Sequence, residues 1–357
     1  MKRQLMKGCE AIAEAAVRGG CRYFFGYPIT PQNDIPEYMS ARLPEVGGVF
    51  LQAESEVAAS NMVYGAAGAG AKVMTSSSSP GISLKQEGIS TICGAELPCV
   101  IVNVMRGGPG IGGIQASQGD YFQATKGGGH GDYRLIVFGP DSVQECIDIM
   151  YDAFTISDQY RTPVMVLADG LIGQMMEPVT MPEFKSEEAL ACEKIWAARG
   201  WYEGCGRPRG IVNSLYIEDE ALEALHQRLQ SRYREIEKNE VKFEYYNIED
   251  AEIIIVAYGT ISRVCRSAID ELAERGIKVG MVRPVTLWPF PSQAVLDAVA
   301  QPSVKKVLAV EISAGQMVED VRLAVNGMKE VAFLGYPGSR IATVEEIIAK
   351  VQALREG

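Results

Sequence analysis

Short apolar runs separated by helical patterns constrain the fold of this chain more than any other feature. The runs Cys99–Val104 and Pro163–Leu167 consist almost entirely of apolar residues. A strand covered on both faces has this continuous pattern, whereas a strand with one exposed face alternates apolar and polar residues. Segments with helical spacing, such as 142–157 and 262–275, alternate with these runs along the chain. The alternation predicts parallel sheets with helices on both faces, which is an α/β fold.

The length of 357 residues is large for a single core, so we expect two domains. A first parallel α/β domain is predicted over residues 1–185. Residues 186–250 are rich in charge and lack strand patterns, which is typical of a helical linker. A second α/β domain is predicted over 251–357, beginning with the apolar run at 252–257.

Helix boundaries can also be estimated from spacing and from the residues that end helices. Leu5, Cys9, Ile12 and Ala16 would share one face of a first helix that ends at the glycine pair 19–20. Further helices are predicted at 57–69, where small residues dominate, and at 83–93, after a Pro-Gly pair.

Composition and charge limit the classes of partner. Hydrophobic residues make up 47% of the chain and charged residues 22%, as in an ordinary globular protein. The formal net charge of −11 argues against nucleic acid or an anionic membrane as the main partner. The first twenty residues carry charges where a signal peptide has an apolar core, and no apolar run reaches the ~18 residues of a membrane span. We therefore expect a cytoplasmic protein.

The cysteines and histidines do not form a recognisable metal motif. None of the eight cysteines is separated from another by the two-residue gap that iron–sulfur and zinc sites use. We interpret them as reduced, mostly buried small residues. Only His130 and His226 offer imidazoles, so a histidine metal site or a Ser-His-Asp triad has little support.

Three polar candidates lie where a predicted strand ends or a predicted helix begins. Thr30 follows a short strand at 22–26, Glu56 precedes the helix at 57–69 with Glu54 as its rival, and Arg106 ends the strand that includes Val104. Ligands of open parallel sheets bind outside the carboxyl ends of strands, so these groups are candidates for a site. Arginine suits a carboxylate because its planar fork donates two parallel hydrogen bonds.

Each candidate also has a structural interpretation. Thr30 before a proline resembles a helix N-cap, although Pro36 would then fall inside the helix and Asn33 or Asp34 would fit better as the cap. Glu56 or Glu54 would complement the dipole of the helix that follows, and Arg106 would lie on the surface.

Two glycine-rich segments resemble nucleotide-binding loops but fit them poorly. Gly108–Gly113 matches G-x-G-x-x-G after a strand, yet no helix pattern opens there, so a nicotinamide dehydrogenase is only an alternative. Gly65–Lys72 has an extra alanine before its lysine and no following Ser or Thr, which excludes a phosphate loop. Loops at 76–81, 118–120 and 127–130 are expected at the ligand-facing edge.

The segments Tyr27–Pro31, Glu54–Glu56 and Arg106–Pro109 resemble the alpha subunit of the 2-oxoacid:ferredoxin oxidoreductase family, of the 3-methyl-2-oxobutanoate (2-ketoisovalerate) type. The resemblance implies a pyrimidine-type thiamine diphosphate domain followed by a transketolase C-terminal-like α/β domain. It implies oxidative decarboxylation of a branched-chain 2-oxo acid to acyl-coenzyme A and CO2, with reduction of ferredoxin.

The same resemblance implies roles for individual residues. Glu56 would hydrogen-bond the aminopyrimidine of the cofactor beside Pro28, while Thr30 and Arg106 would hold the substrate carboxylate and oxo group. The chain has no Gly-Asp-Gly segment with a later asparagine, so a beta subunit would carry the diphosphate half and Mg²⁺. Gamma and ferredoxin-like subunits would supply the iron–sulfur clusters, and coenzyme A would be a co-substrate.

Two alternatives stay open. One is an alpha subunit for 2-oxoglutarate or pyruvate, although the chain shows no additional cation assignable to a second carboxylate. The other is a non-catalytic scaffold subunit, against which the joint presence of Thr30, Glu56 and Arg106 speaks.

Overall fold

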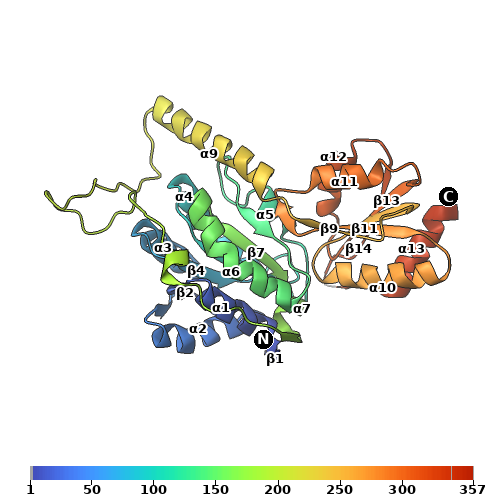
Figure 1. Ribbon diagram of the computed structural model, residues 1–357, viewed down its shortest axis with the longest axis horizontal. Coiled ribbons are helices and arrows are strands. Elements are labelled where there is room, and N and C mark those ends of the chain that lie inside the picture. The colour runs from blue at the N-terminus through green and yellow to red at the C-terminus, as the bar shows by residue number, and fades with distance from the viewer. Residues whose placement is uncertain (1–2, 339, 357) are drawn as a thin grey trace.

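The computed structural model describes residues 3–338 and 340–356, which form two α/β units side by side (Figure 1). The sheet of the first unit has seven strands in the order β12-β6-β7-β5-β4-β2-β3. All neighbours are parallel except β12, which pairs antiparallel with β6. In sheet order the bounds are Thr286–Trp288, Ile136–Phe138, Val164–Asp169, Val100–Met105, Val73–Ser77, Tyr23–Gly26 and Val49–Gln52.

Helices cover both faces of this sheet. The core on one face is built with α1, α2 and α6, which span Gly8–Arg18, Asp34–Glu45 and Val143–Tyr160. The core on the other face is built with α3 and α4, which span Glu56–Gly68 and Ser79–Gly94. The central strands β4, β5 and β7 are therefore buried throughout, which explains the nearly continuous apolar sequences of β5 and β7.

The second sheet has five strands in the order β14-β13-β10-β11-β9, with only β9 antiparallel. Their bounds are Glu330–Gly335, Lys306–Glu311, Ile253–Val256, Val279–Pro284 and Phe243–Tyr246. One face carries α10 and α13, which span Thr260–Glu274 and Val344–Glu356. The other face carries α11 and α12, which span Ser292–Val299 and Met317–Val325.

The remaining elements lie at the margins. Strands β1 and β8, at Gln4–Lys7 and Met176–Val179, form a small antiparallel pair. Short helices occupy Tyr121–Thr125 (α5), Gly170–Gln174 (α7) and Glu187–Leu190 (α8). Residues 191–218 contain neither helix nor strand. Residues 194–198 pack against the first unit, where Ala197 is buried, and a later part of the segment extends away from the body before α9, at Asp219–Asn239 (Figure 1).

Two expected boundaries differ from the structure. Leu5 is not on the first helix: it lies in β1 and is 62% exposed, because β1 pairs with β8 and the helix starts only at Gly8. Helix α4 begins at Ser79 rather than at 83, since proline is compatible with the first helical turn. The N-cap residue of α2 is Asn33, one of the two residues that the sequence favoured over Thr30.

The two units share strands and a core. Strand β9 lies in the segment expected as a linker, yet it pairs with β11 of the second sheet. Strand β12 lies in the segment expected as the second domain, yet it pairs with β6 of the first sheet. A single apolar cluster runs from Ile82 and Ile89 on α4 to Val256 on β10.

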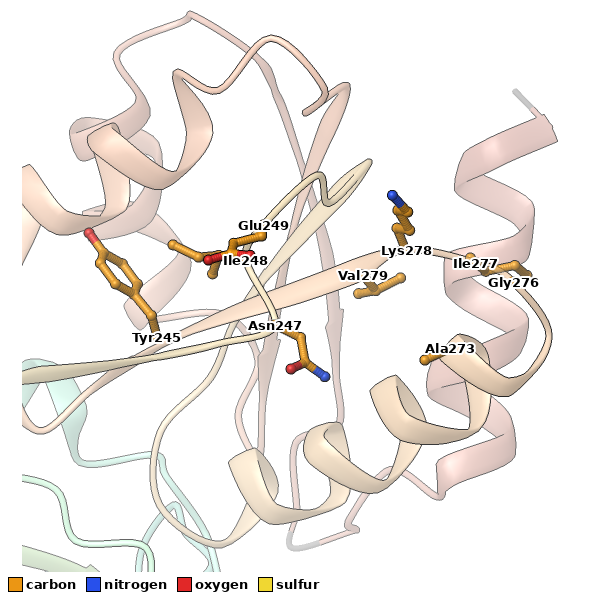
Figure 2. A pocket seen from close by; sticks show the side chains of 9 residues that line it. All are labelled: Tyr245, Asn247, Ile248, Glu249, Ala273, Gly276, Ile277, Lys278 and Val279. Carbon is orange, nitrogen blue, oxygen red and sulfur yellow. The ribbon is translucent and has the colours of Figure 1, made fainter.

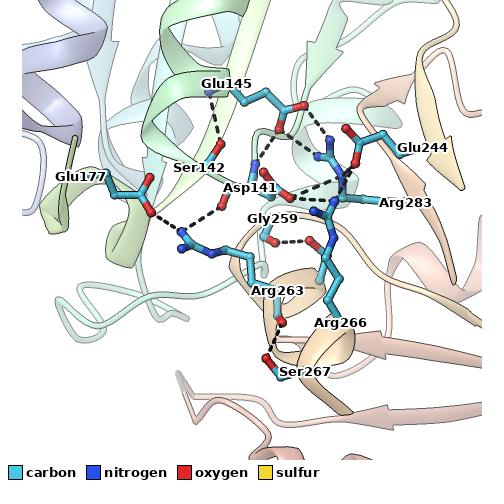
Figure 3. A network of polar contacts seen from close by, with 11 residues as sticks. Asp141, Ser142, Glu145, Glu177, Glu244, Gly259, Arg263, Arg266, Ser267 and Arg283 are labelled. Carbon is cyan, nitrogen blue, oxygen red and sulfur yellow. Dashed lines mark hydrogen bonds and ion pairs between the residues drawn. The ribbon is translucent and has the colours of Figure 1, made fainter. Parts of the chain in front are cut away.

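Buried charges join the units where α6 meets β11 (Figure 3). Arg283 is 1% exposed and donates two hydrogen bonds to Glu145, at 2.8 and 2.7 Å, and one to Glu244 at 2.9 Å. The backbone N–H of Asp141 donates to Glu145 at 2.8 Å. The Arg283 guanidinium therefore neutralises acidic groups from both units at once.

Substitution of Arg283 by methionine should destabilise the chain strongly. Removing the cation leaves the partly buried carboxylate of Glu145 without the cation that the structure pairs with it, whereas Asp141 keeps its ion pair with Arg266. Loss of one partner costs about 3–5 kcal/mol in comparable buried pairs. Denaturant unfolding measures the loss. The matched control is Arg275→Met, which breaks an exposed pair with Glu271 and should cost less than about 1 kcal/mol. Equal losses in the two variants would contradict the stabilising role of Arg283.

Candidate active site

The candidate residues lie at the carboxyl ends of neighbouring strands. In the sheet, β5, β4, β2 and β3 are adjacent in that order. Arg106 follows β5, Ser77 ends β4 and is followed by Ser78 and Ser79, Thr30 follows β2, and Glu56 follows β3. Because these strands are parallel, the four segments meet at one edge of the sheet.

Arg106 and Thr30 are in direct contact. The Arg106 guanidinium donates through one terminal nitrogen to the Thr30 carbonyl at 2.9 Å and to the Thr30 hydroxyl at 3.5 Å. Its other terminal nitrogen donates to the Ile111 carbonyl at 2.8 Å. Arg106 is 7% exposed, whereas Thr30 is exposed. The arginine thus joins the turn after β2 to the glycine-rich loop after β5.

Pro28 lies in the same turn as Thr30 and is exposed. No helix starts at the glycine-rich loop 108–113, where Gly110 and Gly112 have positive φ values of 70° and 60°. The loop returns to β5 through a bridge between Arg106 and Ala116. It therefore lacks the helix N-terminus that a dinucleotide site requires.

Glu56 and Glu54 differ in their surroundings. Ser55 is the N-cap of α3 and accepts a hydrogen bond from the Ala58 N–H at 3.1 Å, which makes Glu56 the first helical residue. Glu56 is 6% exposed, whereas Glu54 is exposed. A Cβ on Gly81 would lie 2.8 Å from a Glu56 carboxylate oxygen, so the carboxylate rests against α4. No hydrogen bond joins Glu56 to Thr30 or Arg106 in the described residues.

A second polar cluster was not predicted residue by residue. The Ser79 hydroxyl lies 2.6 Å from Asp120 Oδ2 and accepts from the Arg106 backbone N–H at 3.0 Å. Asn103 donates to the same Asp120 oxygen at 2.9 Å. Burial raises the pKa of the Asp120 carboxyl, and the bonds from Ser79 and Asn103 oppose that shift. The sequence indicated only that 76–81 and 118–120 are loops at this edge.

Lys85 is the functional candidate that sequence reasoning missed. It lies on α4 and is fully buried, and its ammonium donates to the Thr75 hydroxyl at 2.8 Å. Burial lowers the pKa of Lys85 to about 8, while the charge of Glu56 acts in the opposite direction. A signal was present, because Lys85 has helical spacing from Ile82 and Ile89, both of which are 1% exposed.

Several buried polar atoms at this edge have no hydrogen-bond partner within the part of the chain that the structure describes. They are Ser77 Oγ, Ser78 Oγ, Asn103 Oδ1 and Arg106 Nε. Buried polar atoms are normally satisfied, so such a group at one sheet edge indicates contact with a polar ligand or partner. A buried carboxylate, unpaired hydroxyls and an arginine fit the polar ring and carboxylate groups of a thiamine cofactor and a 2-oxo acid.

Other parts of the molecule offer less chemistry. Among the described residues no group of three or more His, Cys, Asp or Glu side chains could hold a metal ion. Six of the eight cysteines are buried, and Cys192 and Cys205 lie on the extended segment. Searching the same residues finds no helix that could cross a membrane. A surface pocket of about 760 Å³ lies between Tyr245, Asn247 and Lys278, at the amino end of β11 and away from the candidate site (Figure 2).

Comparison with known protein families gives two matches that together span most of the chain. Residues 14–234 match the family described as pyruvate flavodoxin/ferredoxin oxidoreductase, thiamine diphosphate-binding. Residues 251–347 match pyruvate:ferredoxin oxidoreductase core domain II. The chain belongs to the 2-oxoacid:ferredoxin oxidoreductase family, as the resemblance predicted.

Individual relatives cover the full chain. Ketoisovalerate oxidoreductase subunit VorB of Methanothermobacter marburgensis is 47% identical over 99% of this chain and 98% of its own length. The 2-oxoglutarate synthase subunit KorA of Methanocaldococcus jannaschii is 36% identical over 97% and 98%. A structure of 2-oxoglutarate:ferredoxin oxidoreductase from Magnetococcus marinus, with 2-oxoglutarate, coenzyme A and succinyl-CoA bound, superposes with a TM-score of 0.83 at 27% identity. The superposition covers 99% of the present chain and 65% of the chain of the Magnetococcus protein. The predicted fold class is confirmed, and the chain is a subunit of an oxidoreductase.

Substitution of Gly81 by alanine should disturb the position of Glu56. The new Cβ would meet Ser77 Oγ at 2.0 Å and a Glu56 oxygen at 2.8 Å, so α4 must shift. We expect a loss of about 1–3 kcal/mol in unfolding free energy, and lower activity of the assembled enzyme. The control is Gly65→Ala on α3, where a Cβ meets nothing within 4 Å and should stabilise by about 0.5–1 kcal/mol. An active, fully stable Gly81→Ala variant would show that this contact does not matter.

Proposed function

We propose that the chain is the subunit of a 2-oxoacid:ferredoxin oxidoreductase that oxidatively decarboxylates 3-methyl-2-oxobutanoate, and that it forms the aminopyrimidine half of a thiamine diphosphate site. The observation that carries the site assignment is a buried carboxylate, Glu56, opening a helix beside the Arg106–Thr30 contact. When bound, the cofactor supplies the nucleophilic carbon and the electron sink for decarboxylation.

In this proposal Glu56 holds a proton-sharing hydrogen bond to the aminopyrimidine ring nitrogen. Its burial supports the role, because a carboxylate removed from water interacts more strongly with one partner. Glu54 is exposed and opens no helix, which favours Glu56 of the two. Pro28, in the turn that precedes Thr30, would contact the same ring.

Arg106 and Thr30 orient the 2-oxo acid. The Arg106 Nε–H is buried and unpartnered in the described residues, and it would donate to the substrate carboxylate while the terminal nitrogens hold Thr30 and Ile111. The exposed Thr30 hydroxyl would donate to the oxo group. Fixing the carboxylate and the oxo oxygen positions the reacting carbon and stabilises the charge that develops there.

The charges near the site and the similarity to relatives both favour 3-methyl-2-oxobutanoate as the substrate. Segments 27–33, 56–94 and 106–120 around the site contain three cations, Arg106, Lys85 and Lys72. Lys85 is buried against Thr75, and Lys72 precedes β4 at its amino end and pairs with Asp158. A second substrate carboxylate would therefore find no additional cation in these segments. Exposed apolar side chains surround the edge instead: Val57, Leu84, Ile111 and Ile114. Greater identity to the ketoisovalerate subunit than to the 2-oxoglutarate subunit points the same way.

Partner subunits complete the enzyme in this proposal. A beta subunit holds the diphosphate and Mg²⁺, and gamma and ferredoxin-like subunits carry iron–sulfur clusters that pass electrons to ferredoxin. Coenzyme A accepts the acyl group, as suggested by its presence in the solved relative. The assembly acts in the cytoplasm. 2-Oxoglutarate is the second candidate substrate, because that relative binds it.

The reconstituted complex should reduce a dye in a reaction that requires both a 2-oxo acid and coenzyme A. We expect the highest kcat/KM with 3-methyl-2-oxobutanoate, and lower values with 2-oxoglutarate and pyruvate. A preference for 2-oxoglutarate would keep the reaction class and overturn the substrate. No turnover by a complex that contains thiamine diphosphate and intact clusters would favour the scaffold alternative.

Glu56→Gln should lower kcat of this complex by about 10²–10⁴-fold, the range for removal of a group that moves a proton. Glutamine keeps the shape of the side chain but cannot take up the ring proton. Glu54→Gln, two residues away, is the matched control and should retain activity. Inactivity of the Glu54 variant with an active Glu56 variant would reverse the assignment. Gel filtration of both complexes checks that assembly is intact.

A further inference from the structure

Lys85 lies on the face of α4 that packs against α3, the helix that begins with Glu56. Gly81, Lys85 and Gly88 are spaced by four and three residues, so they form one stripe along α4. A Cβ on Gly81 would lie 2.8 Å from a Glu56 oxygen, and a Cβ on Gly88 would lie 2.3 Å from Ser60 Oγ. Glu56 and Ser60 are themselves four residues apart on α3. Lys85 therefore lies between two points at which the helices touch.

The Lys85 ammonium is isolated from water. The side chain is fully buried, and the hydrogen bond that the structure gives it runs to Thr75 Oγ1, at 2.8 Å. An ammonium has three donors, and burying it costs free energy unless charge and hydrogen bonds compensate. Glu56 on α3 is the charged group that acts on it, while β4 presents the hydroxyls of Thr75 and Ser77. Methionine would fill the same space without this cost.

We propose that Lys85 is a positioning residue whose buried positive charge keeps the Glu56 carboxylate ionised, so that the shared proton lies on the aminopyrimidine nitrogen and not on Glu56. The inference rests on the proposed role of Glu56 and adds the group that sets its charge. No bond to carbon is made or broken in this step: one proton lies on the ring nitrogen, and the ammonium stays protonated.

The effect of Lys85 on Glu56 depends on pH because it requires the protonated ammonium. Burial lowers the pKa of Lys85 to about 8, so the group is charged below that pH and neutral above it. The stabilisation of ionised Glu56 is therefore present below about pH 8 and is lost as the pH rises through this value. In a variant without the ammonium the same stabilisation is absent at every pH.

The test measures hydrogen–deuterium exchange at the thiazolium carbon of bound thiamine diphosphate, by acid quench and NMR, without substrate. The protein is the assembled complex at saturating cofactor, and the variants are Lys85→Met and Glu56→Gln. At pH 6–7.5 we expect exchange in Lys85→Met to be at least about tenfold slower than in the unmodified complex. The ratio of the two rates should approach one above pH 9. Lys305→Met, at an exposed lysine just before β13, is the control and should not change the rate.

The outcomes separate the inference from the function on which it rests. Slow exchange in Glu56→Gln with normal exchange in Lys85→Met overturns the role of Lys85 and leaves Glu56 in place. If the ratio of the exchange rates of the Lys85→Met and unmodified complexes does not change with pH, the role of Lys85 is also overturned, because a packing defect would lower the rate equally at every pH. Normal exchange in Glu56→Gln overturns the proposed site and the inference together.

A second variant decides the matter if Lys85→Met does not assemble. Thr75→Val is nearly isosteric and removes the acceptor of the ammonium hydrogen bond. The charged form of Lys85 is then less stable. The pH at which the exchange rate falls should therefore decrease by about one unit. If the exchange rate falls at the same pH in an assembled Thr75→Val complex as in the unmodified complex, the proposal is overturned.

Discussion

The close approach of α3 to α4 is the constraint on which the site depends. Gly81 and Gly88 have no side chains, so the two helices approach closely at these two points, where α4 contacts Glu56 and Ser60. This approach removes water from around the Glu56 carboxylate and leaves Lys85 buried in the same layer. One packing arrangement therefore determines the position of an acidic group and the electrostatic environment in which it works.

The second unit supports the same edge from the other side. Asp169, at the end of β7, accepts hydrogen bonds from the N–H and hydroxyl of Thr260 at 3.1 and 2.8 Å. Gln118 exchanges backbone and side-chain hydrogen bonds with Ile312 at 2.8 and 2.9 Å, and donates to the Tyr258 carbonyl at 2.8 Å. The loop that carries Asp120 is thus held by both units, so the second unit contributes to the geometry of the site without supplying its proposed chemistry.

The parts that the sequence predicted are those in which burial leaves a pattern. Strands β5 and β7 are buried throughout and appear as apolar runs, whereas β3 is short and largely exposed at the sheet edge and was missed. Thr30 and Arg106 were each placed after a strand, and they are in contact. Lys85 was missed because lysine is usually solvated, and its burial depends on glycines whose role appears only when two helices are packed.

Strand β12 has a consequence for how such chains are divided and joined. It is encoded beyond residue 250 but completes the edge of the first sheet beside β6. A fragment cut between the two units would leave the β6 edge unpaired, and exposed strand edges recruit other chains into aggregates. Recombination that exchanged only one unit would carry the same liability. The two units are therefore best treated as one inherited module, and the longer chain of the solved relative contains the counterpart of 99% of this one.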